Sequence, residues 1–167
     1  MKLDSTLVTR SHSRNIFGCS ITRSYWQQAD FWLACFAAVI FWLSFRLLVQ
    51  SSPLIPSIPR LNTSLLFLIF IFPVLEETVF RGLIQESIQK LLEQKQFKII
   101  FLWRISHANL LASLCFSLSH LWSHSALWAL STLIPSLVFG YFKDKYQSLY
   151  PSIVLHIFYN LGFYLLL

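Results

Sequence analysis

The stretch LLFLIFIFPVLEETVFRGLI, from Leu65 to Ile84, decides the fold because it sets two acidic residues inside an apolar run. Eleven residues precede Glu76, too few to cross a bilayer that needs about 20. The apolar pattern resumes after Glu77, so we predict one continuous helix over the whole stretch. A simpler alternative is that the helix leaves the membrane at Leu75 and both glutamates are in water.

The composition points to lipid as the main solvent of this chain. Its 167 residues are 56% hydrophobic and only 12% charged, whereas soluble domains carry about 25% charged residues. The formal charge of +6 falls in the gaps between apolar runs and not in one patch. We therefore predict a bilayer-embedded protein that does not bind nucleic acid. The three cysteines form no CxxC motif, so neither a disulfide framework nor a cysteine zinc site is indicated.

The apolar runs predict an all-α, polytopic transmembrane helix bundle with about five spans. Within the third run, Ser106 is a candidate N-cap for a helix that begins at His107. A polar segment over 85–98 predicts an amphipathic helix at the membrane interface. We expect a basic cytoplasmic tail over 1–30 and a transmembrane domain over 31–167. The predicted spans lie at 31–49, about 65–84, within 99–122, 126–142 and about 149–167.

Basic residues alternate along the chain between rich and poor segments. The positive-inside rule then places the N-terminus in the cytoplasm and the C-terminus outside. We accordingly predict a multi-pass membrane protein with this orientation. The rich segments hold Lys2, Arg10, Arg14 and Arg23, then Lys90, Lys95, Lys98 and Arg104, then Lys143 and Lys145; the poor ones hold only Arg60, with Arg46 at the edge of the first span.

Helical geometry separates the two glutamates. Arg81 lies four residues after Glu77, so the two share a helix face and can form an ion pair. It lies five residues after Glu76, which points about 140° away. We therefore expect Glu77 and Arg81 to be supporting residues and Glu76 to be free for chemistry. Pro73 can kink the helix and open backbone carbonyls nearby.

Three further polar residues lie inside apolar segments and are candidates for catalysis. His120 follows Phe116 by one turn, and His156 and Asn160 share a face four residues apart. A single helical histidine is more often a packed residue than a catalyst, but polar groups in lipid must converge on partners or water. A carboxylate and an imidazole could activate water, and an imidazole with an amide could stabilise an oxyanion. A zinc site of Glu76, His120 and His156 fits the same residue types.

The remaining histidines and serines carry no predicted chemistry. His107 and His124 lie near span ends and are expected at the interface. Ser117 and Ser119 beside His120 are ordinary helix residues, and no GxSxG motif occurs.

Three motifs, EETVFR at 76–81, FSLSH at 116–120 and HIFYN at 156–160, resemble the EExxxR, FxxxH and HxxxN motifs of the CAAX protease and bacteriocin-processing (Abi) family. The resemblance covers about 65–167. It implies an intramembrane glutamic endopeptidase without a cofactor, in which Glu76 and His120 activate water. It also implies that His156 and Asn160 hold the oxyanion, with Glu77, Arg81 and Phe116 in support.

The resemblance does not fix a substrate, but together with the compact size of the chain it favours a protease of the bacterial inner membrane. We expect a membrane-embedded or tail-anchored protein tail, or a small peptide. Because the chain is small for such a family, its substrate cavity could be completed by oligomerisation. The alternatives are a non-catalytic immunity or peptide-binding protein, a zinc-dependent form of the same protease, and a small transporter subunit. The absence of inverted repeats weakens the transporter alternative.

Overall fold

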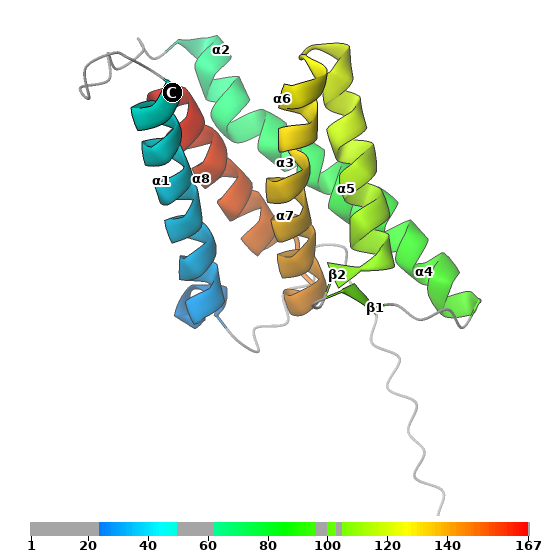
Figure 1. Cartoon of the computed structure of the whole chain (residues 1–167). Helices are drawn as coiled ribbons and strands as arrows, with labels where there is room; N and C mark the ends of the chain where they lie inside the picture. Colours follow the sequence, from blue (N-terminus) through cyan, green and yellow to red (C-terminus); the bar gives the residue numbers. More distant parts are fainter. Residues whose placement is uncertain (1–23, 50–61, 96–99, 103–104, 167) are drawn as a thin grey trace, which may run out of the picture.

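The computed structural model of the chain describes residues 24–49, 62–95, 100–102 and 105–166 (Figure 1). Most of the predicted basic tail therefore lies outside the described residues, as do Arg60, Lys98 and Arg104. The described chain is a helical bundle, as predicted. Its elements are the short 3-10 helix Tyr25–Gln27, α1 (Ala29–Val49), α2 (Thr63–Leu66), the π-helix Phe67–Ile71, α3 (Phe72–Glu77), the π-helix Thr78–Gln85, α4 (Glu86–Gln94), β1 (Ile100–Leu102), β2 (Ile105–Ser106), α5 (His107–Ser119), the 3-10 helix His120–Trp122, α6 (Ala126–Ser131), α7 (Leu133–Tyr146) and α8 (Tyr150–Leu166).

Within the described residues, three helical stretches are long and apolar enough to cross a membrane: Ala29–Leu47, Thr63–Gln94 and Ala126–Tyr146. They correspond to the first, second and fourth predicted spans. The third and fifth predicted spans contain α5 and α8, which have 13 and 17 residues. A straight span needs about 20 residues, so these two helices are short for a full crossing.

A single long helical run forms between Thr63 and Gln94. Asn62 caps it, because its side-chain oxygen accepts a hydrogen bond from the Leu65 amide at 2.8 Å. The amphipathic segment predicted at 85–98 is helical as far as Gln94, but it continues the run and is not a separate helix. The polar end of the run packs against α5 and, through Glu86 and Lys143, against α7.

Pro73 shapes the first half of this run. The π-helix before it pairs residues five apart, since the Phe72 amide donates to the Phe67 carbonyl. In that pattern the next donor, for the Leu68 carbonyl, would be residue 73. Proline has no amide hydrogen, so the Leu68 carbonyl needs another donor, and the Asn160 side chain supplies one at 2.9 Å.

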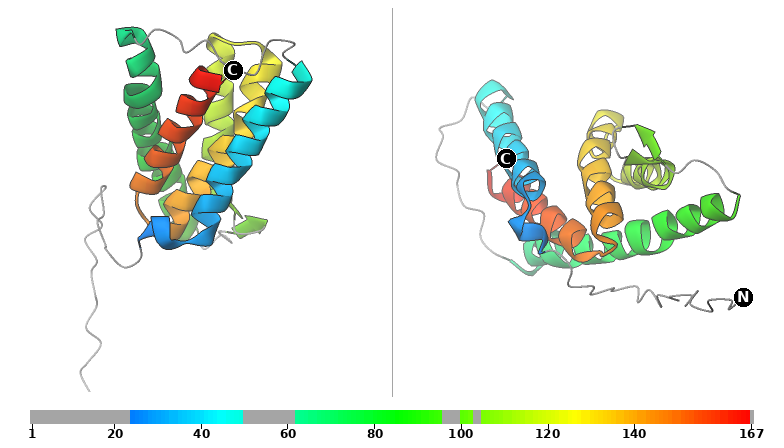
Figure 2. Two further views of the ribbon diagram at one scale, coloured as in Figure 1. Left: turned by 90° about the vertical axis from the view of Figure 1, so that its left-hand side faces the viewer. Right: turned by 90° about the horizontal axis from the view of Figure 1, so that it is seen from below.

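The first half of the long run contacts α8, and the second half contacts α5 (Figure 2). Helix α7 packs against both α5 and α8, and α1 lies on α8. Two glycines permit these close approaches. A Cβ on Gly140 would lie 1.9 Å from the Asn109 Oδ1 atom, and one on Gly162 would lie 2.2 Å from the Trp42 ring. The hydrophobic core between α1, α7 and α8 consists of Phe31, Phe139, Phe142 and Leu155.

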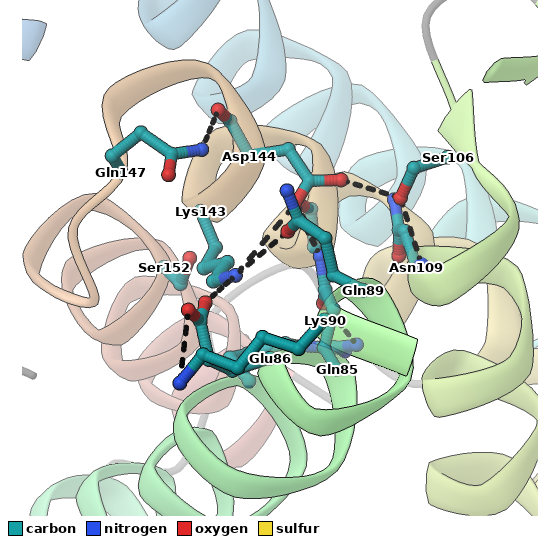
Figure 3. A network of polar contacts seen from close by, with 12 residues as sticks. Gln85, Glu86, Gln89, Lys90, Ser106, Asn109, Lys143, Asp144, Gln147 and Ser152 are labelled. Carbon is teal, nitrogen blue, oxygen red and sulfur yellow. Dashed lines mark hydrogen bonds and ion pairs between the residues drawn. The ribbon is translucent and has the colours of Figure 1, made fainter. Parts of the chain in front are cut away.

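A polar network joins α4, α7 and the start of α5 (Figure 3). The Lys143 ammonium lies 2.6 Å from the Glu86 carboxylate. The Gln85 amide donates to one Asp144 oxygen at 2.7 Å, and the Ser106 hydroxyl donates to the other at 2.6 Å. Ser106 also caps α5, as predicted, by accepting a hydrogen bond from a backbone amide three residues on. The network thus fixes the start of α5 to the far end of the long run.

Candidate active site

Two adjacent glutamates lie at the end of α3 in opposite environments. The Glu77 side chain is fully buried, whereas the Glu76 side chain is 31% exposed. Consecutive residues on a helix point about 100° apart. Only one of the two can therefore face the packed interior between α5, α7 and α8.

The Arg81 side chain fills that interior and is fully buried. Its Nε atom lies 3.3 Å from Glu77 Oε2, which is the predicted ion pair. Its terminal nitrogens donate to Ser113 Oγ at 3.2 Å and to the Ser136 carbonyl and hydroxyl at 2.8 and 2.5 Å. A more distant contact, at 3.4 Å, joins it to Gln85. The guanidinium is thus held by groups from α3, α5 and α7, and by Gln85 of its own π-helix.

Sequence reasoning missed these partners of Arg81. Ser113 and Ser136 are fully buried polar residues in apolar helices. The signal was present in part, because Asn109, Ser113 and Ser117 recur at four-residue intervals and so line one face of α5. The Ser113 hydroxyl also donates to the Asn109 side chain at 3.0 Å. A polar stripe of this kind inside an apolar helix predicts a buried polar partner.

His156 on α8 contacts both glutamates. Its Nδ1 atom lies 2.9 Å from Glu77 Oε1, and its Nε2 atom lies 3.5 Å from Glu76 Oε2. The imidazole is also stacked on the Phe139 ring, with centroids 4.7 Å apart. Glu77 therefore has the expected partner Arg81 at one carboxylate oxygen and a second partner, His156, at the other.

His120 lies just past the end of α5, next to this cluster. Its Nδ1 atom lies 2.9 Å from the Phe116 carbonyl. The Phe116 ring is 4.6 Å from the His120 ring and 5.8 Å from the His156 ring, measured between centroids. Phe116 therefore contacts both imidazoles.

Asn160 lies one turn beyond His156 on α8, as its spacing predicts. Its amide nitrogen donates to the Leu68 carbonyl, which Pro73 leaves without a backbone donor. A primary amide has two N–H groups, and this contact uses one of them. Asn160 is half-buried, so the second N–H can serve another acceptor.

The proposed zinc ligands can be compared with the geometry. Among the residues that the structure describes, no three His, Cys, Asp or Glu side chains are grouped as a metal site. However, metal-bound histidines usually donate their other ring nitrogen to a carboxylate, and Glu77 is in that position for His156. The contact between Glu77 and His156 would therefore suit a zinc-bound histidine as well as a metal-free site.

The arrangement gathers Glu76, Glu77, Arg81 and His156 in direct contact, with Phe116 and His120 beside them. Comparison with protein-family models matches residues 59–162 to the type II CAAX prenyl endopeptidase Rce1-like family. The match covers well over half of the chain and contains all three motifs. Comparisons with curated proteins and with solved structures found no match. The chain therefore belongs to the type II CAAX prenyl endopeptidase Rce1-like family and is an integral membrane peptide hydrolase of the CAAX-protease type.

Proposed function

We propose that the protein is an intramembrane endopeptidase in which Glu76 and His120 activate the attacking water. The observation that carries this proposal is the contrast between the two glutamates. Glu76 is partly exposed beside His156, while Glu77 is fully buried and held by Arg81. Only Glu76 combines a free carboxylate oxygen with access to a substrate.

In the proposed reaction, water attacks the carbonyl carbon of the scissile peptide bond and gives up a proton to Glu76. His120 shares the water through its Nε2 atom, because its Nδ1 atom is engaged by the Phe116 carbonyl. A carbonyl oxygen only accepts hydrogen bonds, so Nδ1 carries the hydrogen and Nε2 carries the lone pair. Collapse of the tetrahedral intermediate breaks the C–N bond, and Glu76 returns the proton to the leaving amine.

Asn160 and His156 are the proposed donors to the oxyanion. The spare N–H of Asn160 is one donor. His156 is the other when both of its ring nitrogens carry hydrogen, since Nδ1 then donates to Glu77 and Nε2 to the oxyanion. Donors that are already fixed before the reaction stabilise the developing charge without reorganisation. Glu77, Arg81 and Phe116 act in this proposal by holding the other groups in place.

The proposed substrate is a membrane-anchored protein tail or a small membrane peptide. A site set among apolar helices favours a substrate that is itself delivered through the bilayer. The alternation of basic segments supports an N-terminus in the cytoplasm and a C-terminus outside, and the proposed location is the bacterial inner membrane. Reporter fusions after Arg60, Lys95, Ser125, Lys145 and Leu167 are expected to alternate in location, and a cytoplasmic C-terminus would refute the orientation.

The proposed function is tested by co-expression with candidate tail-anchored proteins, followed by mass measurement of the products. The wild type should release a fragment that the Glu76→Gln variant does not, at equal protein levels. Glu93→Gln is the matched control, because Glu93 is an exposed glutamate on α4 of the same helical run. Normal cleavage by Glu76→Gln would exclude Glu76 as the base. Binding of a peptide without any cleavage by the wild type would favour an immunity or peptide-binding protein.

A zinc-dependent form of the same protease is the second candidate, favoured by the contact between Glu77 and His156. Glu76, His120 and His156 would then be ligands. We expect purified enzyme to stay active after exhaustive chelation and to contain no stoichiometric zinc. Activity that is lost to a chelator and restored by zinc would establish the alternative.

A further inference from the structure

His120 lies immediately after the last residue of α5. The helix ends at Ser119, and His120 begins a single 3-10 turn. The amides of Ser123 and His124 both donate to the His120 carbonyl, at 3.2 and 3.0 Å. The chain therefore folds back at once, and this brings a second histidine next to the first.

An aromatic cluster, centred on Trp128, packs against this turn. The Trp128 indole on α6 is stacked with the His124 ring, with centroids 4.2 Å apart and planes 23° apart. It is also nearly parallel to the His120 ring at 5.9 Å, and the two imidazoles lie 6.1 Å apart. On its other side, Trp128 meets Phe163 of α8 edge-on at 5.7 Å.

Besides the tilted Phe116 ring, whose centroid is 4.6 Å away, two contacts bear on the direction of the His120 ring. The first is the hydrogen bond from Nδ1 to the Phe116 carbonyl at 2.9 Å. The second is the parallel indole of Trp128, at a distance within the range of favourable aromatic pairs. A single hydrogen bond at a turn allows the ring to rotate away. Because the His120 ring is also stacked on Trp128, its Nε2 atom keeps one direction.

We propose that Trp128 is a positioning residue for His120, and that His124 acts by stacking on Trp128 and not by proton transfer. The proposal rests on the role of His120 in the proposed function. Trp128 is half-buried and tied to α8 through Phe163. It thus connects the loop that carries His120 to the helix that carries His156.

The first test needs no substrate. The chain has five histidines, so nitrogen-15 histidine labelling in detergent micelles gives few resonances, and the His120→Ala spectrum identifies those of His120. The wild type should show the form with hydrogen on Nδ1. Trp128→Ala and Trp128→Leu should show a mixture of both neutral forms, while Trp128→Phe should keep the wild-type spectrum. An unchanged His120 spectrum in a folded Trp128→Leu variant would overturn the proposal.

The second test uses cleavage of an internally quenched peptide that carries a farnesylated cysteine. A misplaced catalytic group can cost about 100-fold in rate, so Trp128→Leu should lower kcat by about 10- to 100-fold with little change in KM. Trp128→Phe should restore most of it. Trp122→Ala is the matched control, because Trp122 lies in the same turn and is 96% exposed. A raised KM with unchanged kcat would instead make Trp128 a substrate contact and overturn the proposal.

Substitutions at His124 distinguish a stacking role from a role in proton transfer. His124→Phe keeps a flat ring against Trp128 and should retain activity, whereas His124→Ala should lose several-fold. Equal loss in both variants would overturn the stacking role. His120→Ala belongs in the same series. If His120→Ala is fully active, the proposed function fails; if it is inactive while Trp128→Leu is normal, only the role of Trp128 fails. The spectra decide the positioning role even if the wild type does not cleave this peptide.

Discussion

The two faces of the long helical run at α3 differ in burial and in hydrogen bonding, although Glu76 and Glu77 are adjacent in sequence. On one face, Glu77 and Arg81 are completely buried, and each is hydrogen-bonded to groups from other helices. On the other face, Glu76 keeps 31% of its side chain exposed and contacts only His156 among the described contacts, at 3.5 Å. Charge inside apolar surroundings is costly unless it is paired and hydrogen-bonded. In the proposed function, the face whose charges are all paired is the scaffold face, and the face of Glu76 is the reacting face.

This comparison suggests how one dipeptide supports both stability and chemistry. The scaffold face uses the second glutamate to fix an arginine and a histidine at once. Because His156 contacts both carboxylates, it connects the scaffold to the reacting face. A change on the scaffold face should thus alter stability first, and a change on the reacting face should alter only activity.

The largest expected effect is that of Glu77→Gln. This change removes the negative charge beside a fully buried Arg81, and breaking a buried pair costs about 3–5 kcal/mol. The free energy of unfolding, measured in detergent micelles with denaturant, should fall by about that amount. Glu76→Gln is the matched control and should unfold like the wild type. Equal stability of the two variants would show that the two faces do not differ as described.

Asn160→Ala is expected to have the next largest effect. Loss of one oxyanion donor lowers the rate by about 100- to 1000-fold, so the cleavage rate should be strongly reduced yet measurable. The same change removes the donor to the Leu68 carbonyl. An unsatisfied buried acceptor costs about 1–3 kcal/mol, so stability should fall as well.

A second substitution can separate these two effects of Asn160. Pro73→Ala restores a backbone amide in the turn that faces the Leu68 carbonyl. In that background, Asn160→Ala should cost less stability but lose as much activity. If stability and activity both recover, Asn160 acts only as the hydrogen-bond donor to the Leu68 carbonyl and not as an oxyanion donor.

Sequence periodicity predicted the contacts that lie within one helix. The pair of Glu77 with Arg81, the Ser106 cap and the neighbouring positions of Phe116 and His120 all follow from three- or four-residue spacing. Contacts between helices could not be predicted in this way. His156 and Glu77 are 79 residues apart in sequence, and nothing in the spacing sets the rotation of one helix against another.

Helix ends were also harder to predict than helix faces. The amphipathic segment continues the long run because Glu86 has a partner in Lys143 on α7, a residue far away in sequence. The fourth predicted span is divided at Thr132 into α6 and α7. Pro135, three residues further on, has no amide hydrogen for the preceding turn. Pro135 could be read from the sequence. Whether the helix would be interrupted there or only bent depended on its packing against the other helices.

A smaller effect is expected for Gly140→Ala, which tests the close contact of α5 with α7 behind the scaffold face. The new Cβ would lie 1.9 Å from Asn109 Oδ1, and Asn109 is itself bonded to the Leu137 carbonyl and to Ser113. Overpacking costs about 1–3 kcal/mol. Gly82→Ala is the matched control, because its Cβ would meet only the end of the flexible Leu149 side chain at 3.3 Å. Equal melting temperatures for the two variants would contradict this packing.

The smallest effect is expected for the ion pair between Asp30 and Lys145, which joins the start of α1 to the end of α7. Their side chains are 31% and 30% exposed, in contrast to the fully buried Glu77 and Arg81. Asp30 also accepts a hydrogen bond from the Tyr141 hydroxyl at 2.8 Å, so Asp30→Asn keeps an acceptor there. Exposed pairs contribute about 0–1 kcal/mol. A double-mutant cycle of Asp30→Asn with Lys145→Met should give a coupling energy in that range that decreases with added salt. Salt screens exposed charges far more than buried ones. A coupling energy above about 2 kcal/mol that does not change with salt would therefore contradict the exposed character of this pair. It would mean that lipid shields this end of the bundle as fully as packing shields Arg81.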